Sequence, residues 1–204
     1  MQEIVTFVLG YLLGSIPFGL VLVRMAGLGD IRKIGSGNIG ATNVYRTGRP
    51  ALALATLVLD ASKGAIAVVV AGLLSDWNSG PMALAGAGAF LGHCFPVWLG
   101  FHGGKGVATY LGTGLALDWR VAGLCALVWL IGAGITRYSS AAALAATLVA
   151  PVLFLAFGEL AFAAAAVFMT ALVYYRHKEN IARLRAGTES KIGQKGTSAQ
   201  TRSG

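Results

Sequence analysis

Charged residues are scarce in this sequence, and so are cysteine and proline. Only 12% of the 204 residues are charged, against about a quarter in an ordinary soluble domain, whereas 56% are hydrophobic. This composition argues against a soluble domain. The two cysteines, Cys94 and Cys125, lie in apolar stretches and match neither a metal-ligand spacing nor a disulfide framework. We therefore expect no metal site and no disulfide.

The hydrophobic residues gather in blocks that come near the roughly 20 residues a helix needs to cross a bilayer. The first block has neither a basic region before it nor a small-residue cleavage site after it, so we expect it to remain as an anchor. The six long blocks are residues 4–23, 51–74, 82–99, 121–135, 141–157 and 160–173. With the shorter segment 107–117, the pattern predicts an all-α polytopic membrane protein with seven transmembrane helices. Because that segment is about half the usual length, five full spans plus re-entrant pieces are the alternative topology.

The basic residues predict the orientation of these spans. Of the 16 Lys and Arg residues, all except Lys63 and Arg120 fall on one side when the spans alternate. Cytoplasmic loops carry the excess of Lys and Arg in membrane proteins. We therefore place the N-terminus outside and the C-terminus in the cytoplasm. The net charge of +8 reflects this bias, so it does not indicate a nucleic-acid partner, and none is expected.

Residues 1–185 are expected to form a single membrane-embedded domain. The remaining residues, 186–204, contain too little apolar side chain to pack. We predict that they form a flexible cytoplasmic tail.

Glycines and small polar residues are concentrated in residues 35–46, GSGNIGATNVYR. The glycines match the spacing of a dinucleotide-binding fingerprint, but no buried strand precedes them, so we reject that interpretation. Glycines expose backbone N–H groups, and the segment adds small polar donors and one arginine, which together suit an anion. The candidate binding residues are Ser36, Gly37, Asn38, Thr42, Asn43 and Arg46. A polar juxtamembrane loop with turn glycines is the alternative.

A second glycine-rich segment is formed by Gly103, Gly104, Lys105 and Gly106. It is no Walker A loop, because Gly106 stands where that motif requires Ser or Thr. The glycines nevertheless allow close approach of the backbone, Lys105 supplies a positive charge, and a helix is predicted to begin just after. This segment predicts a second phosphate-binding loop. A flexible re-entrant bend with one snorkelling lysine is the alternative.

The last apolar block ends in residues 176–181, RHKENI. His177 and Asn180 are three residues apart, so they share a face if the helix continues. The run is equally typical of a cytoplasmic stop signal.

Asp60 and Lys63 form a further polar pair, three residues apart inside an apolar span. Charges at this depth either serve function or pair with each other to hold the loops above, and both interpretations remain open.

Four segments together resemble one known family. They are GSGNIGATNVYR (35–46), LDASKG (59–64), GHCFPVWLGFHGGKGVAT (92–109) and YRHKENI (175–181). In this order they resemble the bacterial PlsY-type acyl-phosphate:glycerol-3-phosphate acyltransferases. The resemblance implies a seven-span inner-membrane enzyme of phospholipid biosynthesis that needs no cofactor. Its reaction would move a fatty acyl chain from acyl phosphate to the first hydroxyl of glycerol 3-phosphate, giving lysophosphatidic acid.

The resemblance also implies roles for the candidate residues. Residues 36–46 would form one substrate loop and residues 103–106 the glycerol 3-phosphate loop, while Ser140 would be the serine of an RYxS segment. The residues expected to be catalytic are Ser36, Arg46, Lys105, His177 and Asn180. Those expected to bind substrate are Gly37, Asn38, Thr42, Asn43, Gly103, Gly104, Gly106 and Ser140. His177 is the candidate base, with a phosphate oxygen of the substrate as the alternative.

No covalent intermediate is indicated by the sequence. It contains neither an H-x-x-x-x-D dyad nor a G-x-S-x-G elbow. An acyl phosphate has a good leaving group, so we expect the glycerol hydroxyl to attack it directly.

A small transporter or channel for an organic phosphate is the competing function, because it would use the same anion-binding loops. Pro17, which can break the first span, is the residue that most favours it. A transporter places its site near the membrane midplane, whereas the polar clusters here are all predicted on the cytoplasmic side. We therefore favour the enzyme.

Overall fold

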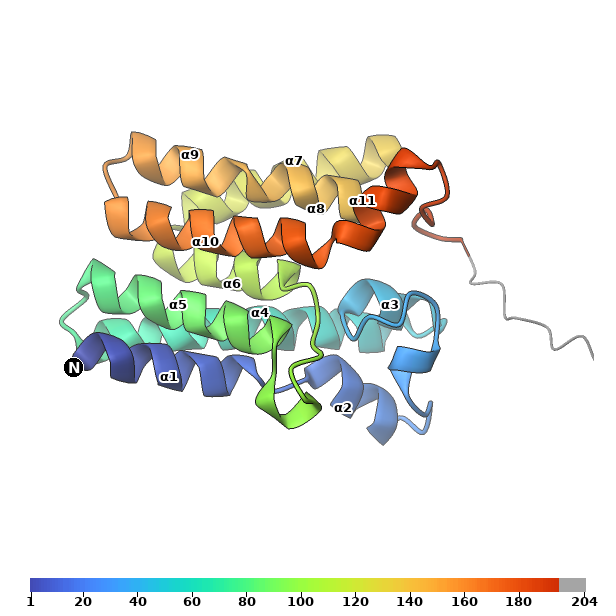
Figure 1. Ribbon diagram of the computed structural model, residues 1–204, viewed down its shortest axis with the longest axis horizontal. Helices are drawn as coiled ribbons and strands as arrows, with labels where there is room; N and C mark the ends of the chain where they lie inside the picture. Colours follow the sequence, from blue (N-terminus) through green and yellow to red (C-terminus); the bar gives the residue numbers. More distant parts are fainter. Residues whose placement is uncertain (195–204) are drawn as a thin grey trace, which may run out of the picture.

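The apolar blocks fold into helices that run along one common direction (Figure 1). The computed structural model describes residues 1–194, and within this range every element is helical. The all-α prediction is confirmed. The helices are α1 Gln2–Gly14, α2 Phe18–Met25, η1 Ile31–Lys33, α3 Ala41–Tyr45, α4 Pro50–Leu74, α5 Ser79–Cys94, η2 Val97–Leu99, α6 Val107–Leu117, α7 Trp119–Thr136, α8 Ser139–Thr147, α9 Val149–Ala156, α10 Leu160–Arg176 and α11 Lys178–Arg185.

Several of these helices are long and apolar enough to cross a membrane. Among residues 1–194 there are five such spans, and a sixth if α10 and α11, which meet at a bend of 58°, count as one. The five are Gln2–Met25, Pro50–Leu74, Ser79–Leu99, Trp119–Thr136 and Ser139–Ala156. The shorter helix α6 packs inside the bundle against α4 and α7. The protein is therefore a multi-pass membrane protein.

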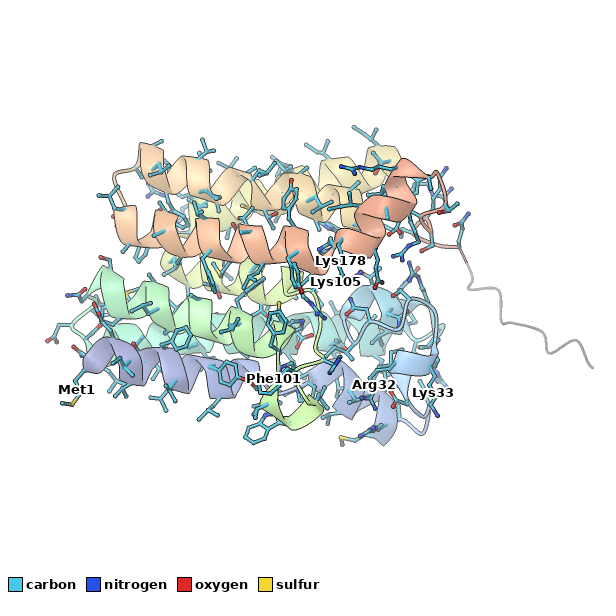
Figure 2. The ribbon with its side chains drawn as sticks, in the orientation of Figure 1. Met1, Arg32, Lys33, Phe101, Lys105 and Lys178 are labelled. Carbon is cyan, nitrogen blue, oxygen red and sulfur yellow. The ribbon has the colours of Figure 1, made fainter. Side chains whose placement is uncertain are left out.

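Basic side chains gather where the polar connections lie. Arg32, Lys33, Lys105 and Lys178 are found at one end of the bundle, and Met1 lies at the other (Figure 2). The short helices α2, α3, η2 and α11 and the loops next to them lie at this basic end (Figure 1). Polar loops from distant parts of the sequence are thereby brought together.

Glycines let neighbouring helices approach until their backbones touch. A Cβ added at Gly14 of α1 would lie 2.0 Å from the carbonyl oxygen of Ala89 in α5. A Cβ at Gly112 of α6 would lie 1.9 Å from the carbonyl oxygen of Ala61 in α4. Such small-residue contacts are how membrane helices pack closely without a hydrophobic driving force.

We expect Gly112→Ala to destabilise the protein and the matched variant Gly123→Ala to leave it unchanged or slightly more stable. Both glycines lie in helices, but a Cβ at Gly123 meets nothing within 4 Å. Overpacking costs about 1–3 kcal/mol, which corresponds to a Tm lower by roughly 2–12 °C for a chain of this size. Thermal unfolding in detergent measures both variants, and equal Tm values would contradict the packing assigned to Gly112.

The first span is broken between α1 and α2. Pro17 lacks a backbone N–H and interrupts the helical hydrogen-bond pattern there. The second piece, α2, supports the polar connection that follows it, because a Cβ at Gly19 would lie 1.9 Å from the carbonyl oxygen of Ile39. Leu20 and Val23 of α2 pack with Ile39 in a small buried cluster. The position of α2 therefore determines where this polar loop lies.

The segment after α11 returns to the bundle. The backbone N–H of Ile192 donates to the carbonyl of Arg137 at 2.7 Å, and the Arg137 guanidinium donates back to the Ile192 carbonyl at 3.1 Å. Glu189 is buried. Hydrogen bonds thus hold residues 186–194, the beginning of the predicted flexible tail, against the bundle in this structure. Residues 195–204 of the predicted tail lie outside the described residues.

Candidate active site

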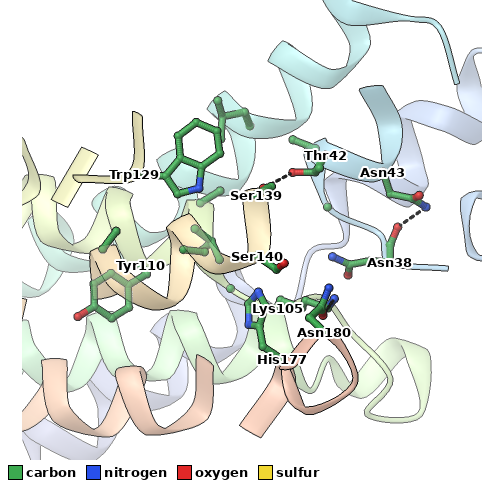
Figure 3. Close-up of a pocket in the computed structure, with 18 of the residues that line it drawn as sticks. Asn38, Thr42, Asn43, Lys105, Tyr110, Trp129, Ser139, Ser140, His177 and Asn180 are labelled. Carbon is green, nitrogen blue, oxygen red and sulfur yellow. Dashed lines mark hydrogen bonds between the residues drawn. The ribbon is translucent and has the colours of Figure 1, made fainter. Parts of the chain in front are cut away.

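The polar loops meet at a cavity of about 340 Å³ (Figure 3). Its polar end is lined by Ser36, Asn38, Thr42, Arg46, Lys105, Ser139, Ser140, His177, Asn180, Arg183, Glu189 and Ser190. Its apolar part is lined by Leu57, Leu111, Cys125, Ala126, Trp129, Leu130 and Ala143, which come from α4, α6, α7 and α8. Leu57 and Leu130 are also exposed on the outside of the bundle. The cavity therefore joins a charged end to a hydrophobic wall that reaches the outer surface.

Asn43 shapes the first polar loop from within. Its side chain is buried, and its Oδ1 accepts the backbone N–H of Ser36 at 3.0 Å. Its Nδ2 donates to the carbonyls of Ile34 and Asn38, both at 2.8 Å. The amide of Asn43 and the N–H of Ser36 are thus occupied within the protein. Asn43 borders the cavity as a scaffold for the loop, and the side chains of Ser36 and Asn38 are what the loop offers to a ligand.

The second glycine segment is clamped from two sides. The N–H groups of Gly103 and Gly104 donate to the carbonyls of Cys94 and His93. Their own carbonyls accept hydrogen bonds from Arg176, at 2.7 Å and 3.0 Å. Neither glycine N–H is available to an anion, so the structure differs here from the phosphate cradle expected from the sequence.

Close packing explains why these positions are glycine. A Cβ at Gly103 would lie 2.2 Å from the His93 carbonyl oxygen, and one at Gly104 would lie 2.1 Å from His93 Nε2. Gly106 lines the cavity, has φ +80° and precedes the first turn of α6. Gly37, Gly103 and Gly104 do not line the cavity. The loop serves to present Lys105, the residue between the glycines.

Lys105 points into the polar end of the cavity, where its ammonium donates to Oδ1 of Asn180 (Figure 3). Burial lowers the pKa of Lys105 to about 8, and the neighbouring positive charge of Arg183 acts in the same direction. A buried ammonium has lost most of its hydration, so it binds an anion readily, since the anion restores favourable surroundings.

Glu189 organises the side chains opposite Lys105. Its Oε1 accepts hydrogen bonds from Ser140 at 2.8 Å and from Asn180 at 2.6 Å, and its Oε2 accepts one from Arg183 at 2.7 Å. Burial alone would raise the pKa of Glu189, but the hydrogen bonds from Asn180, Arg183 and Ser140 lower it below its usual range. Glu189 therefore stays ionised and holds these three donors in place.

His177 lies at the junction of α10 and α11 and is buried. Its Nδ1 lies 2.8 Å from the carbonyl oxygen of Val173, and a carbonyl can only accept, so Nδ1 carries the proton. Burial lowers the pKa of His177 to about 4, and the positive charge of Lys105 acts in the same direction. The ring is therefore neutral at physiological pH, with Nε2 free to accept a hydrogen bond.

Arg46 adds a further positive charge at the polar end. Its guanidinium is half-buried, and it donates to Oγ of Ser190 at 2.6 Å. Burial lowers the pKa of Arg46, which nevertheless remains ionised, as guanidinium groups do in proteins. Nearby, the hydroxyls of Thr42 and Ser139 lie 3.3 Å apart. Because Arg46 and Lys105 both line the cavity, the two polar loops predicted from the sequence converge on it.

Most of the candidate residues line this cavity, but seven polar lining residues are not among the candidates. These are His93, Tyr110, Ser139, Thr147, Arg183, Glu189 and Ser190. Glu189 is the only acidic residue after Glu179, in a region otherwise rich in Lys and Arg. An isolated negative charge in a basic region is the sequence feature that could have indicated a buried partner for the basic and polar side chains of the site.

Comparison with known proteins identifies the family. The glycerol-3-phosphate acyltransferase family matches residues 4–187 of the chain. A glycerol-3-phosphate acyltransferase of Bradyrhizobium diazoefficiens is 58% identical over 191 residues, covering 94% of this chain and 96% of the relative. One of Mesorhizobium japonicum is 57% identical over 193 residues, covering 95% and 97%.

The chain belongs to the glycerol-3-phosphate acyltransferase family. This acyltransferase is also similar to two crystal structures of PlsY, an integral membrane glycerol 3-phosphate acyltransferase. The glycerol 3-phosphate form is 39% identical with a TM-score of 0.89, and the lysophosphatidic acid form is 38% identical with a TM-score of 0.88. Both comparisons cover 95% of this chain and 96% of the solved chain. The resemblance drawn from the sequence motifs is confirmed.

Proposed function

We propose that this acyltransferase moves a fatty acyl chain from acyl phosphate to the first hydroxyl of glycerol 3-phosphate. The products are lysophosphatidic acid, a phospholipid precursor, and inorganic phosphate. The observation that carries the proposal is the single cavity with a cationic polar end and an apolar wall. Both substrates carry phosphate, and one also carries a long hydrocarbon chain, so such a cavity suits the pair. The names of the relatives and of the two PlsY forms support the acceptor and the product.

We assign the polar end to the phosphates. Arg46, Lys105 and Arg183 bring positive charge to it, and Ser36 and Asn38 add uncharged donors. Charge-assisted hydrogen bonds to phosphate are among the strongest polar contacts in proteins. The acyl chain lies along the apolar wall formed by α6, α7 and α8, where its transfer out of water is favourable.

The reaction needs no covalent enzyme intermediate. The first hydroxyl oxygen of glycerol 3-phosphate attacks the carbonyl carbon of the acyl phosphate and forms the new ester bond. The bond between that carbon and the bridging phosphate oxygen breaks, and phosphate leaves with the electron pair. Arg46 and Lys105 hold the substrate phosphates, while the hydroxyl of Ser36 polarises the carbonyl. The protein contributes orientation and electrostatic stabilisation.

A phosphate oxygen of glycerol 3-phosphate is the better acceptor for the hydroxyl proton. His177 has its pKa lowered to about 4, whereas a phosphate monoester titrates near pH ~6. A base works best when its pKa lies near the operating pH, which favours the phosphate. In this arrangement Nε2 of His177 accepts a hydrogen bond from the second hydroxyl of glycerol 3-phosphate and orients the molecule, which leaves the proton of the first hydroxyl for the phosphate. Asn180 holds the ammonium of Lys105 in place.

We further propose that the chain spans the bacterial inner membrane seven times, with residues 1–185 as one domain and the cavity on the cytoplasmic side. Counting α6 and α10 as spans together with the five longer ones gives seven crossings. The basic end of the bundle then faces the cytoplasm, where loops rich in Lys and Arg are usually found. Membrane lipids surround the apolar outer faces of the helices.

The donor test is the direct test of the proposed function. Purified protein in detergent is incubated with glycerol 3-phosphate and either palmitoyl phosphate or palmitoyl-CoA, and lysophosphatidic acid and free phosphate are measured. We expect both products with palmitoyl phosphate and none with palmitoyl-CoA, because the cavity offers cationic groups for a phosphate leaving group. Comparable rates with the two donors would contradict the assignment.

Single cysteines test the orientation. We expect Asp76→Cys and Glu159→Cys to react with a membrane-impermeant maleimide added to intact cells, and Lys33→Cys and Lys178→Cys to react only after the cells are opened. Cys94 and Cys125 are buried, which keeps the background low. Labelling of Lys33→Cys from outside would overturn the cytoplasmic placement of the cavity.

A further inference from the structure

Three buried ionisable side chains lie inside the bundle, one of them, His93, in the cavity lining, and the proposed reaction uses none of them. Asp60 and Lys63 of α4 and His93 of α5 are 2%, 1% and 4% exposed. Lys63 Nζ lies 2.9 Å from Asp60 Oδ1, and His93 Nδ1 lies 3.6 Å from the same oxygen. Charged groups at such a depth are costly and mark functional positions by default.

Lys63 reaches the break in the first span. Its ammonium donates to the carbonyl oxygen of Ile16 at 2.9 Å and lies 5.8 Å from the centre of the Phe18 ring. The carbonyl of Ile16 precedes Pro17, where the helical hydrogen bonds are interrupted. Lys63 therefore fixes the point at which α2 begins. Because α2 packs against the carbonyl of Ile39, this contact also sets the position of the first polar loop.

His93 reaches the second polar loop from the other side. Its carbonyl accepts the N–H of Gly104 at 3.0 Å. Its ring lies so close to Gly104 that a Cβ there would be 2.1 Å from Nε2. The ring thus fills the space between Asp60 and the backbone that leads directly into Lys105. Any displacement of His93 is passed to Lys105.

Asp60 stands between these two contacts. Asp60 Oδ1 is paired with the ammonium of Lys63 at 2.9 Å, whereas His93 Nδ1, 3.6 Å from the same oxygen, is a buried polar atom without a hydrogen-bond partner within residues 1–194. A buried polar atom left unpaired is destabilising, so each one in a native structure calls for an explanation. A requirement for helix packing alone would be met better by apolar side chains of similar size.

We propose that Lys63, Asp60 and His93 are positioning residues that hold the two polar loops at a fixed separation. Lys63 sets the loop that carries Arg46, His93 sets the loop that carries Lys105, and Asp60 joins the two. The result is that Arg46 and Lys105 meet the same pair of substrate phosphates. This inference rests on the proposed function, because it concerns the binding of its substrates.

The first experiment measures steady-state kinetics of Lys63→Met and His93→Leu, with glycerol 3-phosphate varied at saturating palmitoyl phosphate. Each variant is expected to raise the KM for glycerol 3-phosphate by about tenfold, the effect of weakening one charge-assisted contact, with a smaller change in kcat. Lys63→Arg, which keeps the charge, is expected to restore most of the affinity. The control Ser62→Ala removes a hydroxyl that donates only to Val58 in its own helix, and it should leave KM unchanged.

A double-mutant cycle separates positioning from general destabilisation. If His93 acts through Lys105, then His93→Leu should raise KM in the wild-type background but change it less than about twofold in a Lys105→Met background. Additive effects of the two substitutions would overturn the proposal. So would a lowered Tm with an unchanged KM in Lys63→Met and His93→Leu, which is the result of a purely structural pair.

The pair variant Asp60→Asn/Lys63→Met covers the case in which one unpaired buried charge prevents folding, because it removes both charges together. A folded pair variant with wild-type KM would overturn the proposal, and one with a raised KM supports it. Failure of all single and pair variants to fold, with Ser62→Ala intact, would assign the cluster to folding and also overturn it. Failure of the proposed function is recognised separately, since the wild type would then form no lysophosphatidic acid from palmitoyl phosphate.

Discussion

Replacing Lys105 by alanine is expected to raise the KM for glycerol 3-phosphate by roughly 10- to 150-fold while kcat changes much less. Loss of a charge-assisted contact to a bound anion costs about 1.5–3 kcal/mol, and each 1.4 kcal/mol is about tenfold in affinity. A contact that is equally strong in the ground state and the transition state appears in KM. The control is Lys178→Ala, at the same end of the bundle but outside the cavity lining. A change in kcat alone would contradict the binding role of Lys105.

The pH dependence of kcat/KM gives the same assignment a second test. The pKa of Lys105 is lowered to about 8. The ammonium is present below this pH and is lost as the pH rises through it, so kcat/KM for glycerol 3-phosphate should fall above pH ~8. In Lys105→Arg the charge persists, and the fall should disappear from the accessible range. An unchanged alkaline limb in that variant would assign the limb to another group.

His177→Ala is expected to lower kcat about 100-fold, because loss of the acceptor that orients glycerol 3-phosphate misplaces its attacking hydroxyl, and a displacement of about 1 Å can cost that much. The KM for glycerol 3-phosphate should stay close to that of the wild type. His102→Ala is the matched control, since His102 is exposed and does not line the cavity. An unchanged kcat in His177→Ala would remove this residue from the mechanism.

The acidic limb of the rate–pH profile identifies the base. If a substrate phosphate takes the proton, the limb lies near pH ~6, the second pKa of a phosphate monoester, and persists in His177→Ala. If His177 is the base, the limb follows its pKa of about 4 and is lost in the variant. Loss of the limb in His177→Ala would therefore overturn the assignment of the proton to the phosphate.

The helices could be predicted because the apolar blocks are long and the property that defines them is local. Hydropathy alone places α4 as residues 51–74, and the structure has Pro50–Leu74. The break at Pro17 was also visible, since proline removes a helical donor wherever it stands. The pairing of Asp60 with Lys63 could be proposed from their spacing of three residues, and the structure shows it.

The finer arrangement of the site could not be predicted, because it depends on contacts between residues far apart in the sequence. The N–H groups of Gly103 and Gly104 are occupied by carbonyls at the end of α5, which no spacing rule reveals. Glu189 bonds Ser140, 49 residues earlier in the chain. Composition assigned the segment around Glu189 to a flexible tail, since a few hydrogen bonds leave no trace in average hydropathy.

The exposure of Leu57 and Leu130, which also line the cavity, affects how the proposed acyl phosphate donor reaches the enzyme. A chain lying on this wall exchanges with the surrounding leaflet without passing through water, a step that costs about 0.8 kcal/mol for each CH₂ exposed. The concentration that governs donor binding is then its mole fraction among the lipids. The concentration in bulk water governs only the binding of the water-soluble acceptor. Added lipid therefore dilutes the donor, whereas added buffer dilutes the acceptor, although both bind at one site.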